Sequence, residues 1–216
     1  MIPNAKWIRP AQTTGDVCPV YSKQFSLFSS PNQSLSSVAH ATLSVTAMGV
    51  YEASLNGKRI GDFVLAPGWT SYRHRLQVQT YDVTELLSSE NELSILVGKG
   101  WYRSPLAWPD EAHRQQKAQI SAGLIALLTI TYTDGNTQLL PTGANWSAYE
   151  SNVRFSEIYD GETYDAAFDP SSAPIAIEEF DGPSDTLIAQ QGEKITEQER
   201  IVPCLLYTSD AADDLL

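Results

Sequence analysis

The sequence has few of the residues that support metal or nucleophilic chemistry. Among its 216 residues it has three scattered histidines and two cysteines. Cys18 and Cys204 lie too far apart for the spacing of a metal site or of a disulfide framework. No G-x-S-x-G or H-E-x-x-H motif occurs, and the G-K-G of "VGKGWY" (97–102) lacks the rest of a phosphate-binding loop. We therefore expect no catalytic residue, no bound metal and no cofactor.

Long apolar runs are absent too. No stretch of 18 apolar residues occurs, so the sequence predicts no membrane-spanning helix and no membrane partner. The first ten residues, "MIPNAKWIRP", lack the basic and then apolar pattern of a secretory signal. This start predicts a cytoplasmic location, unless the natural N-terminus lies further upstream.

The net charge of −12 comes from one end of the chain. Residues 1–156 have 12 Lys and Arg against 11 Asp and Glu, a net charge of +1. Residues 157–216 have two basic residues against 15 acidic ones, a net charge of −13. This acidic part would repel a polyanion, and no basic stripe occurs elsewhere, so nucleic acid is not an expected partner.

What the sequence does have is the pattern of β-strands. Apolar and polar residues alternate in "ATLSVTAM" (41–48), "LQVQ" (76–79) and "NELSILVG" (91–98), as in half-buried strands. "LIALLTITY" (124–132) begins apolar on both faces, which is typical of a central strand that is covered on both sides.

Two dipeptides predict the turns between these strands. Asn56-Gly57 and Asp134-Gly135 are hairpin turn sequences, because both types of residue tolerate positive φ. Many short strands separated by Gly, Pro and Asn predict an all-β fold, an antiparallel two-sheet β-sandwich of the jelly-roll kind. Helical pattern is scarce: 82–87 has room for about one turn, and 109–119 fits a short exposed helix or a loop.

The motifs occur in an order that resembles a known family. They are "AKWIRP", "PVYSKQFSL", "ATLSVTAMGVYEASLNGKRIGDFVLAPGWTSY", "VQTYDVTELL", "NELSILVGKGWY" and "SEIYDGETYDA". Together they resemble the N-terminal β-sandwich region of bacterial α-L-rhamnosidases, glycoside hydrolase family 78. The resemblance covers residues 5–169. The hairpin sequence "NGKRIG" alone would be a weak signal, since any hairpin could carry it.

The resemblance implies a fragment of a multidomain enzyme. In that family the chemistry belongs to a later (α/α)₆ barrel, where two carboxylates hydrolyse the glycoside with inversion. No long amphipathic helices follow residue 169. We therefore predict a sandwich over 5–169, an acidic linker and entry to a truncated next domain over 170–203, and a non-native tail over 204–216. The implied partners are rhamnose-containing glycans and the downstream domains of the same polypeptide.

Aromatic side chains are the first candidate site, because exposed Trp and Tyr stack on the C–H faces of sugars. The alternative is that some of them fill the sandwich or a domain interface. The candidate carbohydrate-binding residues lie in "LAPGWTSY", "VGKGWY" and the loop after it: Trp69, Tyr72, Trp101, Tyr102 and Trp108.

An acidic segment is the second candidate. "SEIYDGETYD" brings four carboxylates close in sequence, which fits general acid–base catalysis, a calcium site or structural hydrogen bonds. Asp160-Gly161 is a turn signature, which favours the structural interpretation. We expect Asp160, Glu162 and Tyr164 to form an interdomain or structural polar loop.

Three functions compete on these observations. The first is an accessory module of an α-L-rhamnosidase, inactive alone, and we rank it first. The second is a self-sufficient carbohydrate-binding module or lectin, which needs an exposed aromatic platform. The third is a small glycosidase that uses the carboxylates of residues 157–165, which needs a cleft between two of them.

Overall fold

The computed structural model describes residues 2–12, 14–28, 38–105, 111–169 and 174–202. The predicted contact residue Trp108 and the predicted non-native tail 204–216 lie outside these residues.

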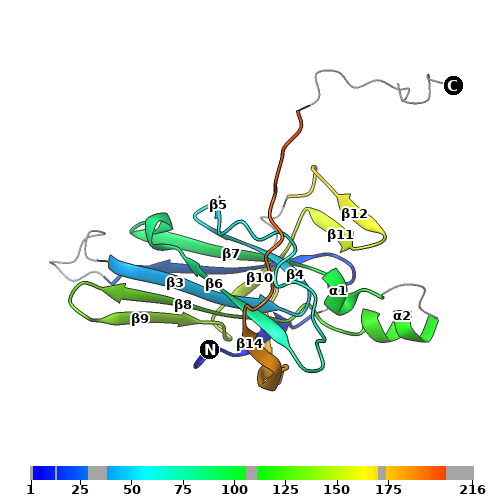
Figure 1. The fold of residues 1–216 in the computed structure, drawn as a ribbon, viewed down its shortest axis with the longest axis horizontal. Coiled ribbons are helices and arrows are strands. Elements are labelled where there is room, and N and C mark those ends of the chain that lie inside the picture. Colours follow the sequence, from blue (N-terminus) through cyan, green and yellow to red (C-terminus); the bar gives the residue numbers. More distant parts are fainter. Residues whose placement is uncertain (1, 13, 29–37, 106–110, 170–173, 203–216) are drawn as a thin grey trace.

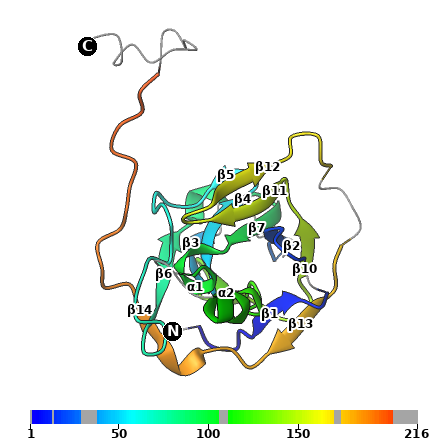
Figure 2. The same cartoon turned by 90° about the vertical axis from the view of Figure 1, so that its right-hand side faces the viewer.

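Two sheets make up the sandwich, as predicted (Figures 1 and 2). The larger sheet has the order β13-β1-β8-β3-β6-β14, and β9 also pairs with β8. Its strands are β1 (Trp7–Pro10), β3 (Val38–Ala47), β6 (Leu76–Asp82), β8 (Leu124–Tyr132), β9 (Thr137–Pro141), β13 (Ile177–Phe180) and β14 (Leu187–Ala189). The smaller sheet has the order β10-β2-β7-β4-β5. Its strands are β2 (Pro19–Ser26), β4 (Val50–Leu55), β5 (Lys58–Arg59), β7 (Glu90–Gly98) and β10 (Ser147–Glu150).

The core between the sheets is built from alternate residues of the central strands. Leu43 and Val45 of β3 are fully buried, and so are Ile95 of β7 and Leu55 of β4 on the facing sheet. Successive side chains of a strand point to opposite faces, so this alternation brings one face of each sheet into the common core. The predicted half-buried strands are confirmed.

β8 is covered on both faces, as its apolar sequence predicts. Residues 124–128 are all buried. Ile125 and Leu127 face a second, outer cluster that includes Trp7 and Ile2 near the N-terminus. The N-terminal segment therefore closes the outer face of the large sheet.

Both predicted hairpin turns are present. Asn56 (φ 55°) and Gly57 (φ 74°) connect β4 to β5, where Leu55 pairs with Lys58. This pair of positive φ angles is the reason for the Asn-Gly sequence. Asp134 and Gly135 lie in the longer loop between β8 and the antiparallel β9.

The "LQVQ" segment departs from a simple half-buried strand, because all four of its residues are buried. Leu76 and Val78 belong to the outer cluster, so the amides point to the face that packs toward the small sheet. Gln79 accepts a hydrogen bond from the hydroxyl of Tyr51 (2.8 Å). Gln77 and Gln79 both donate to the carbonyl oxygen of Pro67 (3.2 and 3.3 Å). Amides at this position are tolerated because each finds partners.

Strands also occur within residues 170–203, where the sequence analysis placed an acidic linker. β13 pairs with β1, and β14 pairs in parallel with β6, so this segment forms both outer strands of the large sheet. β13 (IEEF) has two adjacent glutamates in place of alternation, and β14 (LIA) is only three residues long, so neither gives a strand signal. The parallel β14 is the departure from an antiparallel sandwich. The domain boundaries at 169 and 203 stay predictions.

Short helices close one end of the sandwich (Figure 2). α1 (Gly100–Arg103) follows β7, and α2 (Glu111–Ala118) is the exposed helix that the sequence allowed.

Two 3₁₀ turns lie elsewhere in the chain. η2 (Thr84–Leu86) provides the single turn expected after Asp82, whose carboxylate accepts the N–H of Thr84 (2.9 Å). A further 3₁₀ turn, η3 (Ser184–Thr186), precedes β14.

We predict that Gln79→Leu lowers the free energy of unfolding by about 1–3 kcal/mol, because buried hydrogen-bonding groups lose their partner. The matched control is Gln24→Leu on β2, where the amide is exposed and the change should stay within about 0.5 kcal/mol. Urea denaturation of both variants measures the difference. Equal, small effects would contradict the inward orientation of Gln79.

Candidate functional site

The first candidate region is the second part of the connection between β5 and β6, from Leu65 to Arg75. We call it the aromatic loop, because it contains Trp69 and Tyr72. Leu65 (φ 60°) and Gly68 (φ 83°) take left-handed backbone conformations, and the N–H of Gly68 donates to the carbonyl oxygen of Leu65 (3.0 Å). The carbonyl of Ala66 accepts the N–H of Tyr51 (2.8 Å). The φ of Gly68 is one that residues with a side chain rarely adopt, so glycine suits this tight turn. The loop is therefore held firmly against β4 and β6.

Two of the predicted aromatic residues meet between this loop and α1. The rings of Tyr72 and Tyr102 lie with their centroids 4.7 Å apart, and the hydroxyl of Tyr72 donates to the carbonyl of Gly68 (3.0 Å). Burial raises the pKa of both phenols above its usual value. Both rings pack on the outer cluster, so they support the loop and α1.

The remaining aromatic candidates differ in exposure. Trp69 is 65% exposed and is the one that a ligand could reach freely. Trp101 on α1 is half-buried. The described residues therefore offer one exposed indole beside a packed tyrosine pair.

The acidic segment forms a separate hairpin of β11 (Val153–Glu157) and β12 (Gly161–Tyr164). Glu157 is buried, and one of its carboxylate oxygens accepts the N–H groups of Tyr159 (2.7 Å) and Asp160 (2.8 Å). Gly161 adopts φ 80° in the turn. This carboxylate is thus engaged in holding the turn, whereas Glu162 is exposed.

The pKa of Glu157 reflects two opposing effects. Burial raises it, but hydrogen bonds to the carboxylate outweigh burial, so the pKa lies below its ordinary value of 4.5. The Ser104 hydroxyl also lowers the pKa of Glu157. Neither this hydroxyl nor the second carboxylate oxygen of Glu157 has a hydrogen bond of regular geometry. Glu157 is therefore ionised at neutral pH, and its hydrogen bonds hold the turn of its own hairpin.

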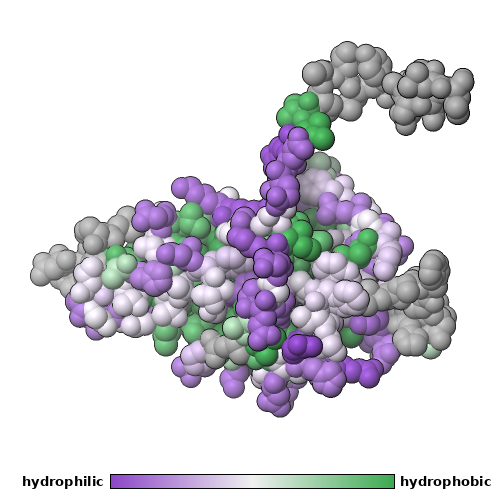
Figure 3. Space-filling model, in the orientation of Figure 1, coloured by the Kyte–Doolittle hydropathy of each residue, from purple (hydrophilic) through white to green (hydrophobic). Residues whose placement is uncertain are grey.

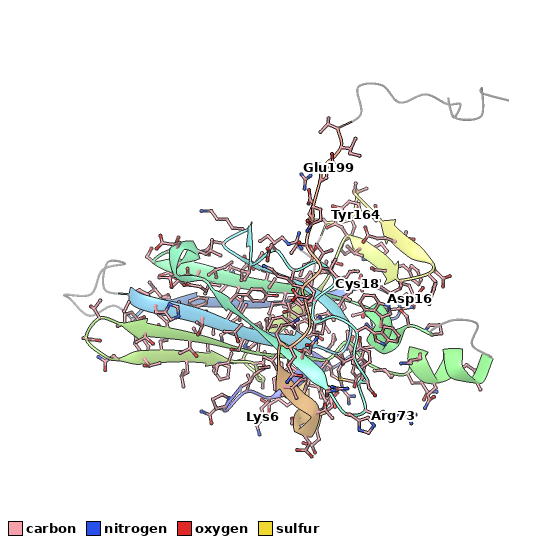
Figure 4. The ribbon with its side chains drawn as sticks, viewed as in Figure 1. Lys6, Asp16, Cys18, Arg73, Tyr164 and Glu199 are labelled. Atoms are coloured by element: carbon pink, nitrogen blue, oxygen red, sulfur yellow. The ribbon has the colours of Figure 1, made fainter. Side chains whose placement is uncertain are left out.

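A cleft of about 310 Å³ lies between this hairpin and the outer face of the small sheet. Glu162 and Tyr164 line it from β12, and Val50 and Leu96 line it from the sheet. Leu65 of the aromatic loop forms the opposite wall. Figure 4 shows Tyr164 on β12 with Cys18 below it. The structure thus brings the hairpin and the loop to one cleft, which the sequence did not predict because Val50 and Leu96 look like ordinary strand residues.

The C-terminal segment leaves the body at this cleft. Ile195 forms a β-bridge with Val64, which also lines the cleft, and residues 196–202 then extend away from the sandwich (Figures 1 and 2). Figure 3 shows mainly hydrophilic residues along this segment and apolar ones where its described part ends, namely the exposed Ile201 and Val202.

The part of the chain that the structure describes has neither a candidate metal site nor a membrane-spanning helix. No three His, Cys, Asp or Glu side chains come together there in a group that could hold a metal ion. No helix within it is long and apolar enough to cross a membrane.

Comparison with known proteins identifies the sandwich. Residues 36–199 match the family model of the α-L-rhamnosidase N-terminal domain. The chain belongs to this family. It is 40% identical over 131 residues to an α-L-rhamnosidase of Streptomyces avermitilis and 39% identical over 135 residues to one of Alteromonas sp. strain LOR. These matches cover 60% and 61% of this chain but 12% and 14% of the relatives.

Solved rhamnosidase structures share the fold. The native enzyme of Aspergillus terreus superposes with a TM-score of 0.75 at 31% identity, over 87% of this chain and 22% of that one. The Streptomyces avermitilis enzyme, solved with L-rhamnose, gives a TM-score of 0.67 at 34% identity, over 81% and 17%. The resemblance to glycoside hydrolase family 78 is therefore confirmed. The chain spans less than a quarter of each of these relatives.

We predict that Glu157→Gln destabilises the fold by about 1–2 kcal/mol at pH 7, because charge-assisted hydrogen bonds become neutral ones. The pKa is depressed in the folded state, so this stabilisation is present above about pH 4.5 and is lost as the pH falls through the folded pKa. Melting temperatures of the wild type and of Glu157→Gln, measured between pH 3 and 7, should therefore converge as the pH falls.

The matched control is Glu162→Gln, which removes an exposed carboxylate from the same hairpin. We expect it to leave the melting temperature nearly unchanged at every pH. A pH-independent difference between Glu157→Gln and the wild type would contradict the ionised state of Glu157.

Proposed function

We propose that this chain is a non-catalytic N-terminal accessory module of an α-L-rhamnosidase, which supports the catalytic domain or substrate recognition. The match of residues 36–199 to the family's N-terminal domain carries this proposal. The engagement of Glu157 with the turn of its own hairpin supports it, since that carboxylate is then not available for acid–base work. A glycosidase that uses residues 157–165 is correspondingly disfavoured.

We further propose that the cleft is where the module meets the domain that follows it in the relatives. Tyr164 (62% exposed) and Ile195 (48% exposed) leave apolar surface at its edge. The chain departs beside it, at the bridge between Val64 and Ile195, so the next domain would begin within reach of this surface. An exposed apolar patch rimmed by polar groups is typical of an interaction site.

A carbohydrate-binding module is the second candidate, and the exposed Trp69 favours it. An indole against one sugar face contributes about 1–3 kcal/mol, which corresponds at best to millimolar affinity. The Pleurotus ostreatus lectin shares the fold at a TM-score of 0.52, but at 18% identity this likeness concerns the fold alone. Micromolar binding of free rhamnose, lost in Trp69→Ala and kept in Tyr159→Ala, would favour this function over an accessory role.

We predict that the purified 216-residue chain does not hydrolyse an aryl α-L-rhamnoside above the rate in buffer, since it spans less than a quarter of the rhamnosidases that it matches. Release of the chromogenic aglycone measures this, with a longer rhamnosidase polypeptide as the positive control. Turnover that disappears in Glu162→Gln would contradict the proposal and would assign the chemistry to the β11–β12 hairpin.

A further inference from the structure

A second cavity lies next to α1 and the segment that follows α2. Figure 2 shows these two helices at the end of the sandwich. Its volume is about 220 Å³, enough to hold a small organic acid or a single sugar unit. Four separate segments line it: the end of β1 with the loop after it, the last residue of α1, residues 119–122 after α2, and Glu178 of β13. Its lining is mostly polar, in contrast to the apolar floor of the cleft under the hairpin.

The guanidinium of Arg103 is the central charged group of this cavity. Its Nε donates to the carbonyl oxygen of Ile120 (2.9 Å), which fixes the side chain at the cavity wall. Burial lowers the pKa of Arg103 below its ordinary value, but an arginine in a protein still remains protonated. No carboxylate among the described residues forms an ion pair with it.

The titratable groups that act electrostatically on Arg103 do not neutralise it. Burial raises the pKa of the Cys18 thiol to about 11 and also raises the pKa of the Tyr21 phenol, so both groups are uncharged at neutral pH. Asp16 also acts on Arg103, but its carboxylate is paired with Lys99 at 2.6 Å. The positive charge of Arg103 is therefore left without a dedicated partner in the described part of the chain.

The other charged residues at the cavity cancel each other. Arg9 pairs with Glu178 (2.9 Å) and lies over the ring of Phe180, 4.9 Å from its centroid. Two arginines and one glutamate line the cavity, so it has a net charge of +1 in a chain whose net charge is −12. Arg103 is half-buried, and a cation that is partly withdrawn from water without a charge partner is unfavourable unless an anion joins it.

We propose that this cavity binds a carboxylate, which pairs with Arg103. The planar guanidinium presents donors in the geometry that matches a carboxylate. Gln12, Gln119 and Ser121 also line the cavity and could hydrogen-bond hydroxyl groups, so a uronic acid fits the lining as well as a simple organic acid does. This inference goes beyond the proposed function and does not depend on it.

The experiment titrates the 216-residue chain with glucuronate, acetate, L-rhamnose and inorganic phosphate at constant ionic strength, and follows ¹H–¹⁵N NMR shifts. We expect saturable binding of glucuronate at about millimolar concentration. In Arg103→Gln and in Gln12→Glu the affinity should fall at least about tenfold, or about 1.4 kcal/mol. Gln12 is exposed, so placing a carboxylate there should block the anion without unfolding the chain. Arg59→Gln on β5 is the control, because it removes the same charge far from the cavity and should bind like the wild type.

The outcomes separate the two sources of carboxylate. Competition of acetate with glucuronate would show that the carboxylate alone suffices, whereas binding of glucuronate only would show that the sugar hydroxyls contribute; both support the proposal. If Arg103→Gln lowers the melting temperature so far that the variant is not folded in the titration, the affinity of Gln12→Glu for glucuronate tests the proposal instead. Four results would overturn the carboxylate proposal. They are the absence of a saturable shift with either carboxylate, equal shifts with L-rhamnose, tighter binding of phosphate, and unchanged affinity in Gln12→Glu.

Discussion

A buried amide cluster between the sheets is the interaction on which the placement of the other parts depends. Gln77 and Gln79 of β6 both donate to the carbonyl of Pro67, and Gln79 accepts the hydroxyl of Tyr51 from the facing sheet. Gln77 also accepts the N–H groups of Gln191 and Gly192 (2.9 and 3.1 Å). One pair of side chains thus connects the large sheet, the small sheet, the aromatic loop and the C-terminal segment.

The surface features follow from this attachment. Because the loop is fixed at Pro67, its two sides are placed at once: Leu65 reaches the cleft under the hairpin, and Trp69 points to solvent. The segment after β14 is fixed at residues 190–192, so it passes Val64 before leaving the body. Glu157 fixes the β11–β12 hairpin in a similar way, since its carboxylate accepts backbone N–H groups of the turn. Each exposed element is therefore held in place by a buried polar group.

The sequence predicts the regular parts of this fold because their signals are local. Alternation identifies β3 and β7, Asn56-Gly57 requires a tight turn, and the apolar start of β8 indicates cover on both faces. Alternation gives the period of a strand but not which face is inward, so the inward amides of β6 could not be read from "LQVQ". The parallel β14 depends on contacts across more than a hundred residues, for which a three-residue strand has no local signal.

The candidate sites show the same limit. Composition draws attention to the aromatic residues, but it could not separate the exposed Trp69 from the packed Tyr72 and Tyr102, because exposure is decided by the neighbouring α1. Arg103 gave no signal at all, since an arginine in a short helix normally lies in solvent and is half-buried here only by segments distant in sequence. Trp108 stays a prediction.

Our central proposal is that the module docks, through the cleft of Leu65 and Tyr164, on the domain that follows it in the relatives. Hydrogen–deuterium exchange, compared between this chain and a longer rhamnosidase polypeptide that contains it, tests this most directly. The account predicts slower exchange in the longer protein at β11–β12 and at residues 64–69, with no change in the β8–β9 turn at 133–136. Equal exchange of the hairpin and the loop in both proteins would contradict it.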